Sequence, residues 1–333
     1  MCQRRESEAT VGPESVIPTP GNVSFTRYAE DGGRFISEFG MHAAPVYETL
    51  RRAIPQGQLY LHSPAMDHHN KDDPKDKGDN LMLAVTGLPR DLDEYVDFSM
   101  IAQAEGLKFG IEHFRRRKPH CSGTLLWQLN DCWPCLSWSV LDYYGFAKAG
   151  YYYARRAYAP VLASFKGLED GGVELWITND TFAEIEELVT ARLRTFAGDV
   201  VWEEDLGFRI AANESRSIRR WEREEVAGRP DHYLSVRSAQ GLCPPNCHFF
   251  AAIKDLRRQP TLPEASIAPG GGSELRVHLT SPAYAYFVHL AVPEETTRFS
   301  DNYFDLEPGE SRTIVVSSAR GRLAAETVSV GWR

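Results

Sequence analysis

The hydrophobic pattern of this 333-residue chain changes at Pro160. Before it, from 34 to 158, short apolar runs alternate with segments whose apolar residues recur every three or four positions. After it, apolar residues recur at every second position, as in 173–178 and 274–279. The first pattern is typical of alternating strands and helices, and the second of antiparallel sheets. The sequence therefore predicts an α/β portion followed by an all-β portion.

The α/β portion is short. Its clearest element is a helix over 91–118, with one apolar stripe, basic residues at its end and Pro119 after it. Two strands and three helices are too few to close an eight-stranded barrel, which needs about 250 residues. This portion is therefore either a small α/β domain or a piece of a larger one. The other expected elements are strands over 34–39 and 122–129, a helix over 44–52 with Pro45 as its first helical residue, a long polar loop around 68–78, and a helix over 147–157.

The all-β portion divides at a polar break, 254–260, which reads as a linker. Short alternating runs separated by Gly- and Asn-rich turns predict two β-sandwiches. Residues near the start, rich in Pro and Gly and without periodicity, read as an irregular arm. The expected domains are the arm over 1–21, the α/β portion over 22–160, and sandwiches over 161–257 and 261–333.

Composition excludes several classes of partner. The chain is 42% hydrophobic and 25% charged, as globular proteins are, and its net charge is −9. An acidic balance argues against nucleic-acid binding. The sequence has no apolar run of the length that spans a membrane, so no membrane partner is expected. Since no signal-peptide core follows Met1, a cytoplasmic location is favoured.

The cysteines offer two chemical interpretations. Cys132 and Cys135 have the spacing of a thiol–disulfide oxidoreductase, and with Cys243 and Cys247 they would make four zinc ligands. An irregular loop around Pro134 and the separation of the two pairs favour ordinary loop cysteines instead. The histidines at 62, 68 and 69 lack metal-ligand spacing and are expected to be loop residues.

Two side chains at strand ends carry a sharper signal. Glu38 lies near the end of a short apolar strand, where a carboxylate is costly unless paired, and where barrel enzymes place catalytic groups. The alternative is a structural salt bridge with Arg34 or Arg52. Trp127 lies on the second strand, and a tryptophan ring there either stacks on a sugar or packs in the core.

Together these segments resemble a known family, the β-mannosidases of glycoside hydrolase family 2. The stretch 34–40, RFISEFG, is similar to their nucleophile segment, and GTLLWQLNDCWP at 123–134 is similar to their final barrel strand and the following loop. Late in the chain, RFSDNYF at 298–304 resembles their terminal domain. The resemblance implies the C-terminal part of a (β/α)8 TIM barrel followed by two immunoglobulin-like β-sandwiches.

The resemblance also implies a function. Members of this family are retaining exo-glycosidases that remove terminal β-D-mannose, so the expected partner is a β-mannoside oligosaccharide or glycan. Glu38 corresponds to the nucleophile, and Trp127 to the wall or floor of the mannose subsite. Asp131 and Trp133 would shape the rim of the same subsite. No metal or organic cofactor is implied.

The chain departs from the family in one catalytic element. A retaining glycosidase needs a second carboxyl as acid and base, and the family places it upstream, beside an Asn. The acidic residues Glu6, Glu8, Glu14 and Glu30 lack that context. We therefore expect a truncated chain, inactive alone, whose partner is the missing N-terminal portion.

Two other functions stay open. One is a non-catalytic β-sandwich module that binds carbohydrate or another protein. The other is a sister exo-glycosidase of the same family, such as a β-glucuronidase or an exo-β-glucosaminidase.

Overall fold

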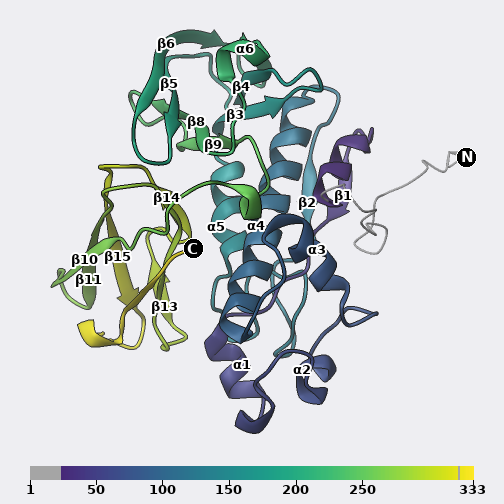
Figure 1. Cartoon of the computed structure of the whole chain (residues 1–333), viewed down its shortest axis with the longest axis vertical. Coiled ribbons are helices and arrows are strands. Elements are labelled where there is room, and N and C mark those ends of the chain that lie inside the picture. The colour runs from purple at the N-terminus through teal and green to yellow at the C-terminus, as the bar shows by residue number, and fades with distance from the viewer. Residues whose placement is uncertain (1–23, 322) are drawn as a thin grey trace, which may run out of the picture.

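The computed structural model describes residues 24–321 and 323–333 (Figure 1). The expected arm, together with Glu6, Glu8 and Glu14, lies outside the described residues. A long helix, α4, runs through the centre, with one sandwich at one end and the other along its side. The elements of the first portion are η1 Ser24–Glu30, β1 Ile36–Phe39, α1 Tyr47–Ala53, η2 Gln56–Gln58, α2 Pro64–His68, α3 Lys77–Val85, α4 Leu92–Arg116, β2 Thr124–Leu126 and α5 Ala149–Ala157.

Strands β1 and β2 pair in parallel. Ile36 lies opposite Thr124, and Phe39 lies opposite Leu126. Parallel neighbours need a crossover connection, and here the helices α1 to α4 supply it. Both strands are shorter than expected. In the described part of the chain this sheet has these two strands, so it does not close into a barrel.

Two local expectations for this portion are wrong. Helix α1 begins at Tyr47, since the N-cap residue Val46 has an extended backbone and Pro45 precedes it outside the helix. The expected long polar loop contains α2 and α3. Helix α3 forms there because Leu81, Met82 and Val85 bury one face of it, although its flanks are polar.

Helix α4 follows its sequence pattern closely. The Asp91 side chain caps it by accepting a hydrogen bond from the Glu94 backbone N–H at 2.9 Å. The apolar stripe is buried, with Leu107 and Ile111 fully inaccessible to solvent. Arg116, one of the basic residues at the end of the helix, donates a hydrogen bond to the Phe165 carbonyl at 3.0 Å and so connects the helix end to the next sandwich.

The sandwich that follows consists of two antiparallel sheets. Every second residue of its second strand, namely Val173, Leu175 and Ile177, is buried between them. One sheet has the order β3-β4-β7 and the other β6-β5-β8-β9. Its elements are β3 Val161–Gly167, β4 Val173–Asn179, β5 Ile185–Thr195, β6 Val200–Ile210, β7 Ser215–Trp221, α6 Arg223–Val226, β8 His232–Ser238 and β9 Asn246–Phe249.

The terminal sandwich has sheets of order β10-β11-β15-β13 and β14-β12-β16. Its inner faces bury Leu275, Val277 and Leu279 against β12 and β15. Its elements, with the preceding turn η3 Ile253–Asp255, are β10 Glu264–Pro269, β11 Glu274–Thr280, β12 Ala285–Ala291, β13 Thr297–Phe299, β14 Phe304–Leu306, β15 Ser311–Ser318, η4 Ala325–Thr327 and β16 Ser329–Gly331.

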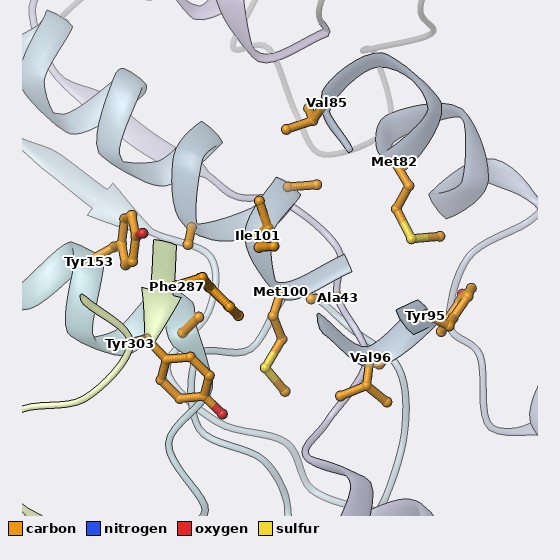
Figure 2. Packing of buried hydrophobic residues seen from close by; sticks show 14 of the residues in the cluster. Ala43, Met82, Val85, Tyr95, Val96, Met100, Ile101, Tyr153, Phe287 and Tyr303 are labelled. Carbon is orange, nitrogen blue, oxygen red and sulfur yellow. The ribbon is translucent and has the colours of Figure 1, made fainter. Parts of the chain in front are cut away.

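The first portion and the terminal sandwich share one hydrophobic core. Figure 2 shows Phe287 and Tyr303 of the sandwich beside Met100 and Ile101 of α4. Tyr153 of α5 borders the same cluster. Because this contact is apolar and fully buried, the two parts are held in one arrangement rather than joined by a loose linker.

Candidate active site

Glu38 is the third residue of β1, close to the carboxyl end of the strand. Its side chain is partly exposed and makes no hydrogen bond or ion pair with the described residues. The alternative of a structural salt bridge is therefore wrong for this part of the chain. Arg52 pairs with Glu48 and Glu295 instead. The structure thus leaves a carboxylate at a strand end without a partner.

Trp127 directly follows β2, at the same end of the sheet. Its backbone N–H donates to the Phe39 carbonyl at 2.7 Å, which places it beside the residue that follows Glu38. Its side chain is 42% exposed, so it does not pack in the core. The peptide bond between Trp127 and Gln128 is cis. The structure therefore brings the two strand-end residues to neighbouring positions.

Gly40 makes this approach possible. A Cβ added at Gly40 would lie 1.8 Å from the Trp127 carbonyl oxygen, a distance that only glycine permits. The Tyr28 hydroxyl donates to the Gly40 carbonyl at 2.7 Å from the other side. Sequence reasoning treated Gly40 only as the end of the strand, so it missed this role.

Asp131 does not lie on a sugar-facing rim, which corrects the expectation for it. Its side chain is fully buried and accepts hydrogen bonds from Ser137 at 2.7 Å and Ser139 at 2.5 Å. Lys71 pairs with it at 3.0 Å. Burial alone would raise the pKa of the carboxyl, but the serine hydrogen bonds and the charges of Lys148 and Lys71 outweigh burial and lower the pKa. Asp131 therefore holds the loop together from inside.

Trp133 stacks on a histidine. Its ring lies 5.0 Å from that of His69 at an interplanar angle of 28°, and His68 meets it edge-on at 5.8 Å. The His69 Nδ1 also lies 2.5 Å from the Pro134 carbonyl oxygen. These histidines are structural residues of the loop, and Trp133 is partly exposed beside them.

A buried lysine that sequence reasoning missed supports the same loop. Lys148 is completely inaccessible and donates to the Ala43 carbonyl at 3.1 Å and the Ser137 carbonyl at 3.3 Å. Burial lowers its pKa to about 8, against the opposing attraction of Asp131 and Asp142. Its position before α5 gave no signal, because the residues that surround it come from distant segments.

Asp142 closes the end of the loop. It accepts hydrogen bonds from the Thr49 hydroxyl at 2.6 Å and from the backbone N–H groups of Tyr144 and Phe146. Burial raises the pKa of this carboxyl. Both acidic groups of the loop are therefore engaged in structure.

The cysteines of the described residues are unpaired. Cys132 is exposed and Cys135 is buried, and neither forms a disulfide. Burial raises the pKa of Cys135 to about 12, the opposite of an activated thiol. Among the residues that the structure describes, no group of three metal-ligand side chains gathers, and no helix has the length and apolarity to cross a membrane.

Two family models match the sandwiches. A mannosidase Ig/CBM-like domain matches residues 171–255, and an Ig-fold domain of mannosidases matches residues 258–330. The chain is also similar to β-mannosidase B of Aspergillus niger, with 39% identity over 140 residues, which is 39% of this chain and 16% of that protein. β-Mannosidase B of Aspergillus fumigatus is 33% identical over 183 residues, 48% of this chain and 21% of the other.

Among solved structures, a β-D-mannosidase from Dictyoglomus thermophilum superimposes with a TM-score of 0.84 and 28% identity, over 92% of this chain and 38% of that one. The chain is β-mannosidase-like, and it corresponds to the C-terminal portion of a glycoside hydrolase family 2 protein.

This β-mannosidase-like chain shares its fold more widely. An exo-chitosanase from Amycolatopsis orientalis superimposes with a TM-score of 0.72 at 17% identity, over 96% of this chain and 44% of that one. At that identity the likeness concerns the fold alone. The β-mannosidase-like chain spans about a sixth to a fifth of the length of the curated relatives it matches.

Proposed function

We propose that this chain supplies the nucleophile and part of the sugar-binding wall of a retaining exo-β-mannosidase. The observation that carries the proposal is an unpaired carboxylate, Glu38, beside an exposed indole, Trp127, at the carboxyl ends of two adjacent parallel strands. Enzymes of the TIM-barrel class place their catalytic groups at that end. In this proposal β1 and β2 are the last two strands of such a barrel.

The reaction assigns one role to each residue. The Glu38 carboxylate attacks the anomeric carbon, an ester bond forms, the glycosidic C–O bond breaks, and the leaving oxygen takes a proton from an acid. Water, deprotonated by the same acid group in its basic form, then attacks the ester and releases mannose and the carboxylate. Trp127 stacks on the apolar face of the sugar.

The second carboxyl is proposed to come from outside the chain. The acidic residues of the neighbouring loop, Asp131 and Asp142, both accept hydrogen bonds within the protein. Glu30 lies at the surface in an ion pair with Arg27 at 3.4 Å. Without an acid the leaving group is not protonated, so the chain alone is proposed to be inactive.

A chimaera tests the proposal. The part of the D. thermophilum enzyme that superimposes on this chain is replaced by this chain, and hydrolysis of an aryl β-mannoside is measured. We expect activity that Glu38→Gln reduces by a factor of about 10³ or more, since it removes the nucleophile. The control Glu169→Gln changes an exposed carboxylate that has no hydrogen bond or ion pair within the described part of the chain, and it should leave the rate unchanged.

A trapping experiment assigns the role directly. A 2-fluoro-mannosyl fluoride should form an ester on Glu38 of the chimaera with loss of fluoride, detectable by peptide mass. An ester on another residue would contradict the assignment. Glu38-dependent turnover by the chain alone would contradict the proposed inactivity. Faster turnover of an aryl β-glucosaminide or β-glucuronide than of the aryl β-mannoside would show that the substrate is that sugar and not mannose.

A further inference from the structure

A separate cavity of about 750 Å³ lies between the first portion and the terminal sandwich. Its walls are the loop 141–147, the first turn of α5, and strands β12 and β13 with the segment that follows. Neither Glu38 nor Trp127 lines it. The volume falls within the range of about 300–1,000 Å³ that small-molecule sites occupy.

Two buried tyrosines in this cavity have unpartnered hydroxyl groups. Tyr152 is 3% exposed and Tyr303 is 6% exposed, and neither hydroxyl has a hydrogen-bond partner among the described residues. Neither hydroxyl oxygen belongs to the fully buried polar atoms without a partner, so both are accessible from the cavity. In this chain Tyr28 donates to the Gly40 carbonyl and Tyr284 donates to Asp305. The cavity therefore presents polar groups that the protein itself does not satisfy.

The backbone of Tyr303 is held in an unfavourable conformation. Its φ is +50°, in the left-handed region that bulky residues avoid. The buried Asn302 fixes it, because its Oδ1 accepts from the N–H groups of Tyr303 at 3.1 Å and Leu290 at 2.8 Å. Strained residues of this kind are frequent at binding and catalytic sites.

The rest of the lining fits a neutral, polyhydroxylated molecule. Phe146, Tyr151 and Phe299 contribute aromatic rings, on which the apolar faces of sugar rings stack. The charged side chains nearly balance, with Arg155 and Arg298 against Glu48, Asp93 and Asp97, so the cavity does not select an anion or a cation. A tyrosine hydroxyl both donates and accepts, as sugar hydroxyls do.

From these observations we infer that this cavity binds a neutral oligosaccharide, at a site distinct from the proposed reacting centre. The cavity lies between α5 and the terminal sandwich, so a ligand bound in it contacts both. The inference goes beyond the proposed hydrolysis and does not depend on it, because binding requires neither the nucleophile nor an acid.

Calorimetric titration of the full chain with β-1,4-mannotriose tests the inference. Tyr303→Phe and Tyr152→Phe remove one hydroxyl each and keep the rings, and each should weaken binding about threefold to tenfold. Tyr60→Phe, an exposed tyrosine outside the cavity, is the matched control and should bind as the unaltered chain does. Glu38→Gln should also bind normally, which separates this site from the proposed active site.

Thermal unfolding of each variant establishes that it is folded. The same sensitivity to Tyr303→Phe with cellotriose in place of mannotriose would also support the inference, since both are neutral oligosaccharides. Absence of binding by both trisaccharides at millimolar concentration would overturn it. Binding that both cavity variants leave unchanged, or that Glu38→Gln abolishes, would overturn it too.

Discussion

A carboxylate at the junction of the three parts of the chain makes the stability of the folded chain depend on pH. Glu105 of α4 lines a cavity of about 350 Å³ that the terminal sandwich also borders. Burial raises its pKa from 4.5 to about 7, and the negative charge of Asp305 adds to this rise. The nearby Lys108 and the hydrogen bond that the Tyr286 hydroxyl donates at 3.0 Å oppose it.

The sign of the effect follows from proton linkage. A carboxyl whose pKa is higher in the folded chain than in the unfolded chain stabilises the fold at low pH, and this stabilisation is lost as the pH rises toward the folded pKa. Glu105→Gln imitates the protonated form at every pH. Relative to the unaltered chain, the variant should gain about 1 kcal/mol of unfolding free energy at pH 5 and about 3 kcal/mol at pH 8.

Urea unfolding at several pH values between 5 and 8 measures this difference, followed by tryptophan fluorescence. Other titrating groups are common to both proteins, so their effects cancel in the comparison. Glu169→Gln is the control, since this exposed carboxylate makes no hydrogen bond or ion pair with other described residues and should give no pH-dependent difference. A difference between Glu105→Gln and the unaltered chain that stays constant over this range would refute the reasoning.

Two further predictions concern the strand ends and the loop beside them. Gly40→Ala should lower the unfolding free energy by at least about 2 kcal/mol, because the new Cβ would lie 1.8 Å from the Trp127 carbonyl oxygen. The control Gly57→Ala, at a position with open space around it, should change the unfolding free energy by less than about 0.5 kcal/mol. Equal melting temperatures for these two variants would count against the close approach. Asp131→Asn should cost about 2–4 kcal/mol, since it weakens the serine hydrogen bonds and leaves Lys71 unpaired, and limited proteolysis should then cut the loop 127–148 faster. An unchanged cleavage rate would disprove the structural role of the carboxylate.

Local patterns in the sequence predicted the most strongly periodic elements. The periodicity of α4 and the alternation of β4 and β11 needed no tertiary information, because each element buries one face that its own spacing defines. Helix α3 was missed since only its contact with α4 makes its apolar residues a buried face. The pairing of β1 with β2 was not a local property either, as residues 40–123 lie between the two strands.

The site divides in the same way. The residue types and motifs of the sequence pointed to Glu38 and Trp127, and these assignments stay predictions until the chimaera is tested. The tertiary structure alone showed that Glu38 has no salt-bridge partner among residues 24–321 and 323–333 and that Trp127 is exposed. It also moved Asp131 from the rim to the interior of the loop and revealed Lys148 beneath it.

The sequence by itself determined where the most strongly periodic strands and helices form, where the chain changes from α/β to all-β, and which family its motifs resemble. These depend on residue spacing and on short motifs, which are local. Only the tertiary structure decided which carboxylates have hydrogen-bond or ion-pair partners among the described residues. It alone decided how the terminal sandwich encloses a second cavity against α5. Hydrogen bonds and burial join residues distant in the chain, so no local pattern contains them.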